Sequence, residues 1–145
     1  MNQIKRIKKL SNKFKAIFAL NRAISLQEVG RDKEALHLLD KHTEMLKGKF
    51  LGYHLNRGRI LINADHDYKN AIEEFYQGIS VIDSKRKMKP NKQEYLLAWT
   101  KYMIAWCYAE LGEKNTAEHW RNEHAKHRFD YDSVPSITRN EFPMK

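Results

Sequence analysis

The chain has 145 residues, of which 41% are hydrophobic, 31% charged and 11% aromatic. This length fits one domain with a core of its own, and the composition is typical of a folded globular protein rather than a disordered one. The longest apolar stretch falls well short of the length needed to cross a bilayer, which excludes a membrane-spanning helix.

The compartment is inferred from the cysteine content and the N-terminus. Cys107 is the only cysteine, so an internal disulfide is impossible, and this favours a reducing compartment. The basic N-terminus is not followed by an apolar stretch of secretory length, so we expect no signal peptide. Both observations predict a cytoplasmic protein.

The formal net charge of +9 comes from two segments. Residues 1–22 contain seven basic side chains and no acidic one, and residues 84–93 contain five and again no acidic one. The rest of the chain has 15 basic residues against 18 acidic ones and is therefore mildly acidic. Positive charge concentrated in this way predicts contact with an acidic partner through these segments.

Helical periodicity begins near the N-terminus. Apolar residues recur every three or four positions from Ile4 to Val29, and Gly30 is a typical helix terminator. Asp32 is expected to cap a second helix, which Gly48 ends. Further helices are predicted over residues 50–63, 68–82 (capped by Asp67), 94–111 and 115–127. No segment alternates with period two for long enough to form a strand, so the predicted fold class is all-α.

A short side chain recurs near the start of three of these helices. Ala35, Ala71 and Ala117 are 36 and 46 residues apart, and the second interval is longer by ten, the length of the basic linker 84–93. Helices that cross at about 8–10 Å need a small side chain at the contact. A recurring helix pair of this size is typical of a stacked helical repeat.

Residues 16–128 resemble the tetratricopeptide repeat family. In that family the first helix carries a small residue three positions before an aromatic one, a turn follows, and the second helix opens with alanine and a large residue four positions later. The matching residues are Ala23, Leu26, Gly30, Ala35 and Leu39; Ile62, Asp67, Tyr68, Ala71, Phe75 and Gly78; and Ala105, Tyr108, Gly112 and Ala117. The sequence departs from the pattern at Arg121, where a large apolar residue is expected, and lacks the closing prolines.

The resemblance implies three stacked antiparallel hairpins, over about residues 16–48, 49–83 and 94–128, whose first helices line a concave surface. Residues 1–15 form a basic N-terminal helix, and residues 129–145 form an irregular tail. This tail is either disordered or lies back along the stack through Phe129, Tyr131 and Phe142. The positions implied for a partner-binding surface are Tyr53, Asn56, Arg57, Ile60, Asn63, Trp99, Tyr102 and Trp106. For the helix over residues 94–111, which is apolar nearly all round, the alternative is a central helix packed on several sides.

The N-terminal segment has three interpretations. It could contact an acidic protein, it could bind nucleic acid or an anionic membrane together with residues 84–93, or it could pack Ile7, Leu10 and Phe14 onto the stack and leave its lysines in water. The basic residues expected to make contacts are Lys5, Arg6, Lys8, Lys9, Lys85, Arg86 and Lys87.

The sequence contains no recognisable catalytic motif. His119, His124 and His127 lie on one predicted helix, but only His124 and His127 share a face, and no further ligand pattern accompanies them, so we expect neither a metal nor a cofactor. Cys107 is interpreted as a small core residue. The predicted function is a non-enzymatic interaction module that binds a protein or peptide: a regulator, an effector, or a toxin that this protein would neutralise as an immunity protein.

Overall fold

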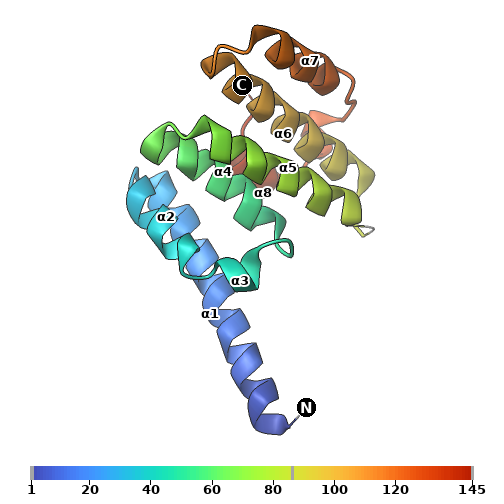
Figure 1. The fold of residues 1–145 in the computed structure, drawn as a ribbon. Coiled ribbons are helices and arrows are strands. Elements are labelled where there is room, and N and C mark those ends of the chain that lie inside the picture. The colour runs from blue at the N-terminus through green and yellow to red at the C-terminus, as the bar shows by residue number, and fades with distance from the viewer. Residues whose placement is uncertain (1, 86, 145) are drawn as a thin grey trace. The chain divides into compact units, whose positions relative to one another are not determined.

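The computed structural model describes residues 2–85 and 87–144, and every regular element within these residues is helical (Figure 1). The predicted all-α fold is therefore confirmed. The described residues form two compact units, Met1–Asp67 and Tyr68–Lys145. The boundary between the units falls inside the second of the three predicted hairpins, after residue 67.

The first unit contains α1 (Gln3–Glu28), α2 (Asp32–Asp40), α3 (Thr43–Leu46) and α4 (Leu51–Asp65). α2 packs against both α1 and α4, and its turn from α1 contains Gly30 at a φ of 79°, a conformation that glycine adopts without strain. Asp32 is the first residue of α2 and not its cap, which is Arg31. Its charge still lies at the positive end of the helix dipole.

The second helix predicted for this unit is divided in two. It was expected to run to Gly48, but α2 ends at Asp40 and α3 begins at Thr43, which places a turn at residues 41 and 42. Gly48 has a φ of 72°, and its N–H donates to Nε2 of the buried His54 at 2.8 Å. This hydrogen bond ties the end of the α3 turn to α4.

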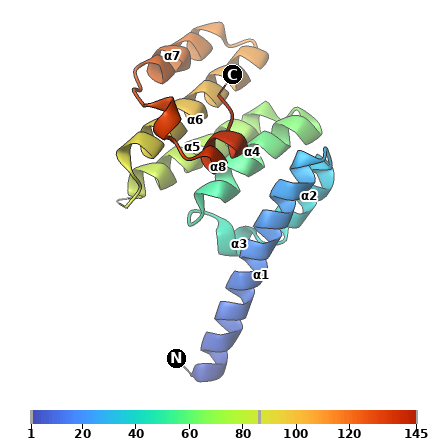
Figure 2. The same cartoon turned by 180° about the vertical axis from the view of Figure 1, so that it is seen from behind.

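The core of this unit depends on small side chains on α1. Ala16 and Ala23 are fully buried and belong to one cluster with Ala35, Leu39 and other residues of α2 to α4. Alanines at the contact allow two helices to approach closely. Residues 2–15 are exposed throughout, and in Figures 1 and 2 α2 runs beside only the C-terminal half of α1.

The second unit contains α5 (Tyr68–Ser84), α6 (Pro90–Glu110), α7 (Lys114–Ala125), the 3₁₀ helix η1 (Tyr131–Ser133) and α8 (Ser136–Glu141). α6 packs against both α5 and α7. It begins earlier than predicted, within the basic segment 84–93, because Pro90 occupies its first turn, where a missing N–H has no cost. Ala71 and Ala117 are fully buried, as Ala35 is in the first unit.

The C-terminal segment is more ordered than expected. η1 and α8 lie within the residues predicted to be an irregular tail. The hydroxyl of Tyr95 on α6 donates to the Phe142 carbonyl at 2.6 Å, and Trp99 Nε1–H donates to the Pro143 carbonyl at 3.2 Å. Of the two alternatives for the tail, the segment folds back along α6.

Candidate partner-binding surfaces

One face of α6 carries four aromatic residues: Tyr95, Trp99, Tyr102 and Trp106. Their spacing of four, three and four places them in a row along the helix. The row has two different ends. Tyr95 and Trp99 are buried, whereas Tyr102 and Trp106 are 37% and 40% exposed.

Trp99 was predicted to be a partly exposed anchor, and this prediction is wrong. Its ring lies 4.9 Å from that of Phe142 and 5.8 Å, edge to face, from that of Phe75 on α5. The C-terminal segment covers the Tyr95 end of the row as well, where the Phe129 ring is 5.2 Å from that of Tyr95. Trp99 is therefore a core residue of its unit because the chain itself occupies this part of the face.

Neighbouring rings hold the exposed end of the row in place. Trp106 meets the ring of Tyr68 edge to face at 6.2 Å, and Tyr102 lies 5.6 Å from the ring of His124 on α7. His124 is fixed in turn, since its Nδ1 is 2.7 Å from the Ala98 carbonyl. Large rings held this way lose little entropy when they bind a partner, and they offer apolar faces with polar edges. Tyr68 and His124 were not predicted as part of this surface, because they lie outside the row and reach it through packing.

The predicted surface residues on α4 divide in the same manner. Tyr53 and Asn56 are buried, so the prediction that they line a surface is wrong. Tyr53 belongs to the core of the first unit and donates its hydroxyl to Thr43 Oγ1 at 3.2 Å, while Asn56 Nδ2 donates to the Gly52 carbonyl at 2.8 Å. Ile60 is also buried. Tyr53, Asn56 and Ile60 therefore have the helical spacing of a row on one face, but this face is buried.

Arg57 and Asn63 are the two predicted α4 residues that reach solvent. Arg57 is half-buried and pairs with Asp40 of α2 at 3.0 Å, which links α4 to α2 within the unit. Asn63 is exposed and lines a shallow groove with residues of the α1–α2 turn. The ion pair with Asp40 therefore gives Arg57 a structural role within its unit.

The basic residues predicted on α1 lie on its exposed half. Lys5, Arg6, Lys8 and Lys9 are all exposed. The interpretation in which this helix packs its large apolar residues onto the stack is wrong, because Ile7, Leu10 and Phe14 are 61%, 53% and 68% exposed. The buried side of α1 is formed instead by Ala16, Ala19, Leu20, Ala23 and Leu26.

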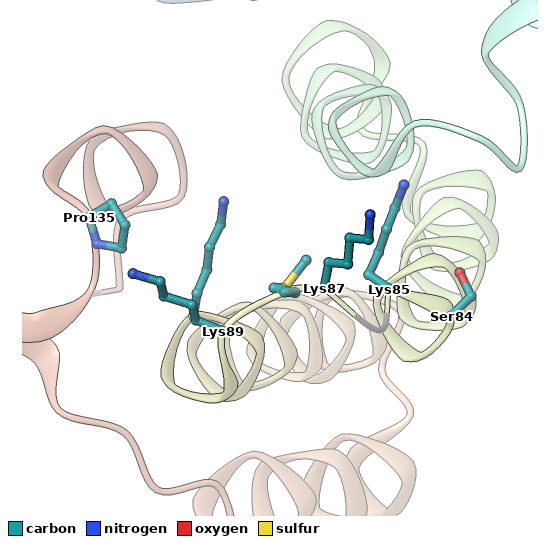
Figure 3. Close-up of a pocket in the computed structure, with 7 residues that line it drawn as sticks. Ser84, Lys85, Lys87, Lys89 and Pro135 are labelled. Carbon is teal, nitrogen blue, oxygen red and sulfur yellow. The ribbon is translucent and has the colours of Figure 1, made fainter.

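A second basic surface lies between α5 and α6. An open groove of about 680 Å³ is lined by Ser84, Lys85, Lys87, Met88, Lys89, Lys92 and Pro135. In Figure 3 the side chains of Lys85 and Lys87 extend to the same side of the ribbon, and that of Lys89 extends toward Pro135. Arg86, predicted as a contact residue here, lies outside the described residues.

His124 near the end of α7 and His127 just after this helix have structural partners. His127 Nδ1 is 2.6 Å from a carboxylate oxygen of Glu94 on α6, and His124 contacts the Ala98 carbonyl as described. Within residues 2–85 and 87–144, no group of three His, Cys, Asp or Glu side chains is placed to hold a metal ion. In the same part of the chain, no helix combines the length and the apolar character needed to traverse a bilayer.

Comparison with known proteins gives no assignment: no family model, no curated protein and no solved structure matches this chain. The function has to be inferred from the surfaces themselves.

Proposed function

We propose that the chain is a non-enzymatic binding module that holds a protein or peptide partner, with Tyr102 and Trp106 on α6 as its anchors. The observation that carries this proposal is that the same aromatic row already binds a peptide segment. At its other end, Tyr95 and Trp99 donate hydrogen bonds to backbone carbonyls of residues 142 and 143, while Phe142 packs on Trp99. At the exposed end, a partner chain would contact the same kinds of group: the rings of Tyr102 and Trp106, the Tyr102 hydroxyl and the Trp106 indole N–H.

We further propose that the helices are tetratricopeptide-like hairpins. The turns between α1 and α2 and between α6 and α7 contain Gly30 and Gly112 with φ values of 79° and 80°. Ala35 and Ala117, near the starts of the second helices of these pairs, are fully buried. A glycine turn followed by a buried alanine supports this architecture, in which small residues let paired helices approach.

The partner is expected to offer an apolar side chain to the anchors and an acidic patch to the basic residues 84–93 of the same unit. It would be a regulator, an effector or a toxin that this protein neutralises. Buried aromatic anchors account for much of the binding energy in protein interfaces, whereas charges mainly raise the association rate and make binding dependent on salt. Binding that is equally tight at low and high salt would count against the acidic patch.

The test is capture of a partner from the native cell by three forms of the chain: the parent, Tyr102→Ala/Trp106→Ala, and Val29→Ala. Val29 is a matched control because it is a large apolar residue, 69% exposed, in the other unit. We expect the parent and Val29→Ala to retain the same partner and the double variant to lose it, with an affinity at least about tenfold weaker. Equal capture by the double variant would contradict the proposed anchors.

A further inference from the structure

α1 has two different apolar faces. One face, with Ala16, Leu20 and Ala23, packs into the core of its unit. The other carries larger side chains and points away from that core, because residues 4, 7, 10, 14 and 18 lie roughly opposite on a helix that turns about 100° per residue. The second face has no covering element among the described residues, as its exposure shows.

This second face, which we call the α1 stripe, is long and strongly exposed. Ile4, Ile7, Leu10, Phe14 and Phe18 are 75%, 61%, 53%, 68% and 71% exposed. Between its first and last member it extends for about 20 Å, at about 1.5 Å per residue. Ser11 is the polar residue within it. Five large apolar side chains aligned in water are costly unless a partner covers them.

Basic residues flank the α1 stripe on both edges. On a helical projection Lys8 and Lys15 border one edge, and Arg6 and Lys13 border the other. All four are exposed, and residues 1–22 contain no acidic side chain. Long basic side chains at the edges of an apolar strip can lay their methylenes along it and extend their charged ends to a negative surface.

This arrangement argues against two other occupants. A second copy paired stripe to stripe would bring seven basic residues of each chain together with no acidic residue in the segment to offset them. Nucleic acid would neutralise the lysines through its phosphates but would leave the five apolar side chains in water. The occupant must therefore be apolar where it contacts the α1 stripe and negatively charged where it contacts the basic residues on either edge.

We propose that residues 3–18 of α1 lie in the plane of an anionic lipid bilayer, with the α1 stripe among the acyl chains and the flanking lysines at the headgroups. A basic helix with large aliphatic and aromatic residues on one face is the form that binds the membrane interface. The helix lies on the surface and does not span the bilayer, in agreement with its many charges. This inference does not depend on the aromatic row of α6.

The test measures partitioning of the full chain onto two kinds of vesicle by sedimentation. One kind mixes phosphatidylglycerol with phosphatidylcholine, and the other contains phosphatidylcholine alone. We expect binding to the anionic vesicles and at least about tenfold weaker binding to the neutral ones, because each lysine near an anionic surface adds a favourable electrostatic contribution. Equal partitioning onto both kinds, or none onto the anionic kind, would overturn the proposal.

Three variants separate insertion from charge alone. Ile7→Gln/Leu10→Gln/Phe14→Gln removes apolar side chains and keeps the charge, and Arg6→Gln/Lys8→Gln/Lys13→Gln/Lys15→Gln removes the four flanking charges and keeps the stripe. The matched control, Lys85→Gln/Lys87→Gln/Lys89→Gln/Lys92→Gln, removes the same number of charges from the other unit. We expect the first two to lose binding by about tenfold or more and the control to bind like the parent.

Other outcomes reject the proposal in distinguishable ways. If the apolar variant binds anionic vesicles as tightly as the parent, the contact is one of charge alone. If the control loses as much binding as the α1 charge variant, net charge rather than the stripe is responsible. Light scattering that shows a dimer of the parent and a monomer of the apolar variant would assign the stripe to a second copy. Because the substituted residues are exposed, apart from the half-buried Lys92, unchanged far-ultraviolet circular dichroism is expected to verify that each variant folds.

Discussion

Cys107 lies at the centre of α6 and is completely buried. Burial raises the pKa of its thiol to about 12, and the charge of Glu110 adds to the effect. The thiolate is the reactive form, so we expect iodoacetamide to alkylate the native protein at least about a hundredfold more slowly than the protein unfolded in urea. Mass spectrometry of timed samples measures the two rates. Comparable rates would show that this part of α6 is open to solvent.

The same pKa shift predicts a dependence of stability on pH. The pKa of Cys107 is raised in the folded state above its ordinary value of 9.0, so folding favours the protonated thiol. This contribution is complete below about pH 9 and is lost as the pH rises toward 12. The free energy of unfolding of the parent should therefore fall, relative to that of Cys107→Ala, across this range. Parallel curves for the two proteins would contradict the assignment.

The three alanines and the aromatic residues show what sequence could and could not predict about single residues. Ala35, Ala71 and Ala117 are fully buried, as their spacing predicted, because a methyl group at a close helix crossing is a local requirement. The burial of Trp99 was not predictable in the same way. Its spacing is that of an aromatic surface row, and the residues that cover it, Phe142 and Pro143, lie more than forty positions later in the chain.

At the level of elements, the contact between α6 and the C-terminal segment gives a direct prediction. Phe142 is buried against Trp99, and its removal leaves a cavity that opens to solvent. We expect Phe142→Ala to cost about 3 kcal/mol, the lower end for a buried phenylalanine, and to shift tryptophan emission to longer wavelength. Ile137→Ala is the control, since Ile137 lies on α8 and is 75% exposed. An unchanged emission spectrum in Phe142→Ala would mean that the segment does not shield Trp99.

The α1 helix shows why the element boundaries were easier to predict than the buried faces. Its end at Gly30 follows from local backbone geometry, and the structure confirms it. Its buried face does not follow from the size of the apolar residues, because the core takes up Ala16 and Ala23 and leaves Phe14 and Phe18 in water. Close packing against α2 favours the smaller side chains. Periodicity alone does not distinguish an apolar face that packs in the core from one that stays exposed.

For the whole molecule, the absence of two-residue alternation was sufficient to predict an all-α fold. The division into two compact units was not predicted, because the helices over residues 50–63 and 68–82 were expected to form one hairpin, and the boundary falls between them. The candidate surfaces were predicted only in part. The basic residues predicted to make contacts are exposed where they are described, whereas several proposed anchors belong to cores, since burial depends on contacts that no local pattern encodes.

Each unit has buried residues of its own, and the tryptophans offer a probe for one of them. Trp99, Trp106 and Trp120 all belong to the unit Tyr68–Lys145, so their fluorescence reports on that unit, whereas circular dichroism reports on helices throughout. Leu39 is fully buried in the core of the other unit, and Leu39→Ala is expected to cost about 2–5 kcal/mol there. We expect Leu39→Ala to lower the urea concentration at which the unit Met1–Asp67 unfolds, so that part of the circular dichroism is lost earlier, while the fluorescence transition stays near that of the parent.

The reciprocal change completes this experiment. Phe75 is fully buried against Trp99, so Phe75→Ala is expected to lower the fluorescence midpoint, while the part of the circular dichroism transition that comes from the other unit stays close to its parental position. Separate shifts are expected because each substitution removes contacts from only one core. If instead both probes move together in both variants, the two units unfold as one cooperative body, as closely coupled repeats do when the interactions between neighbours exceed the stability of each unit.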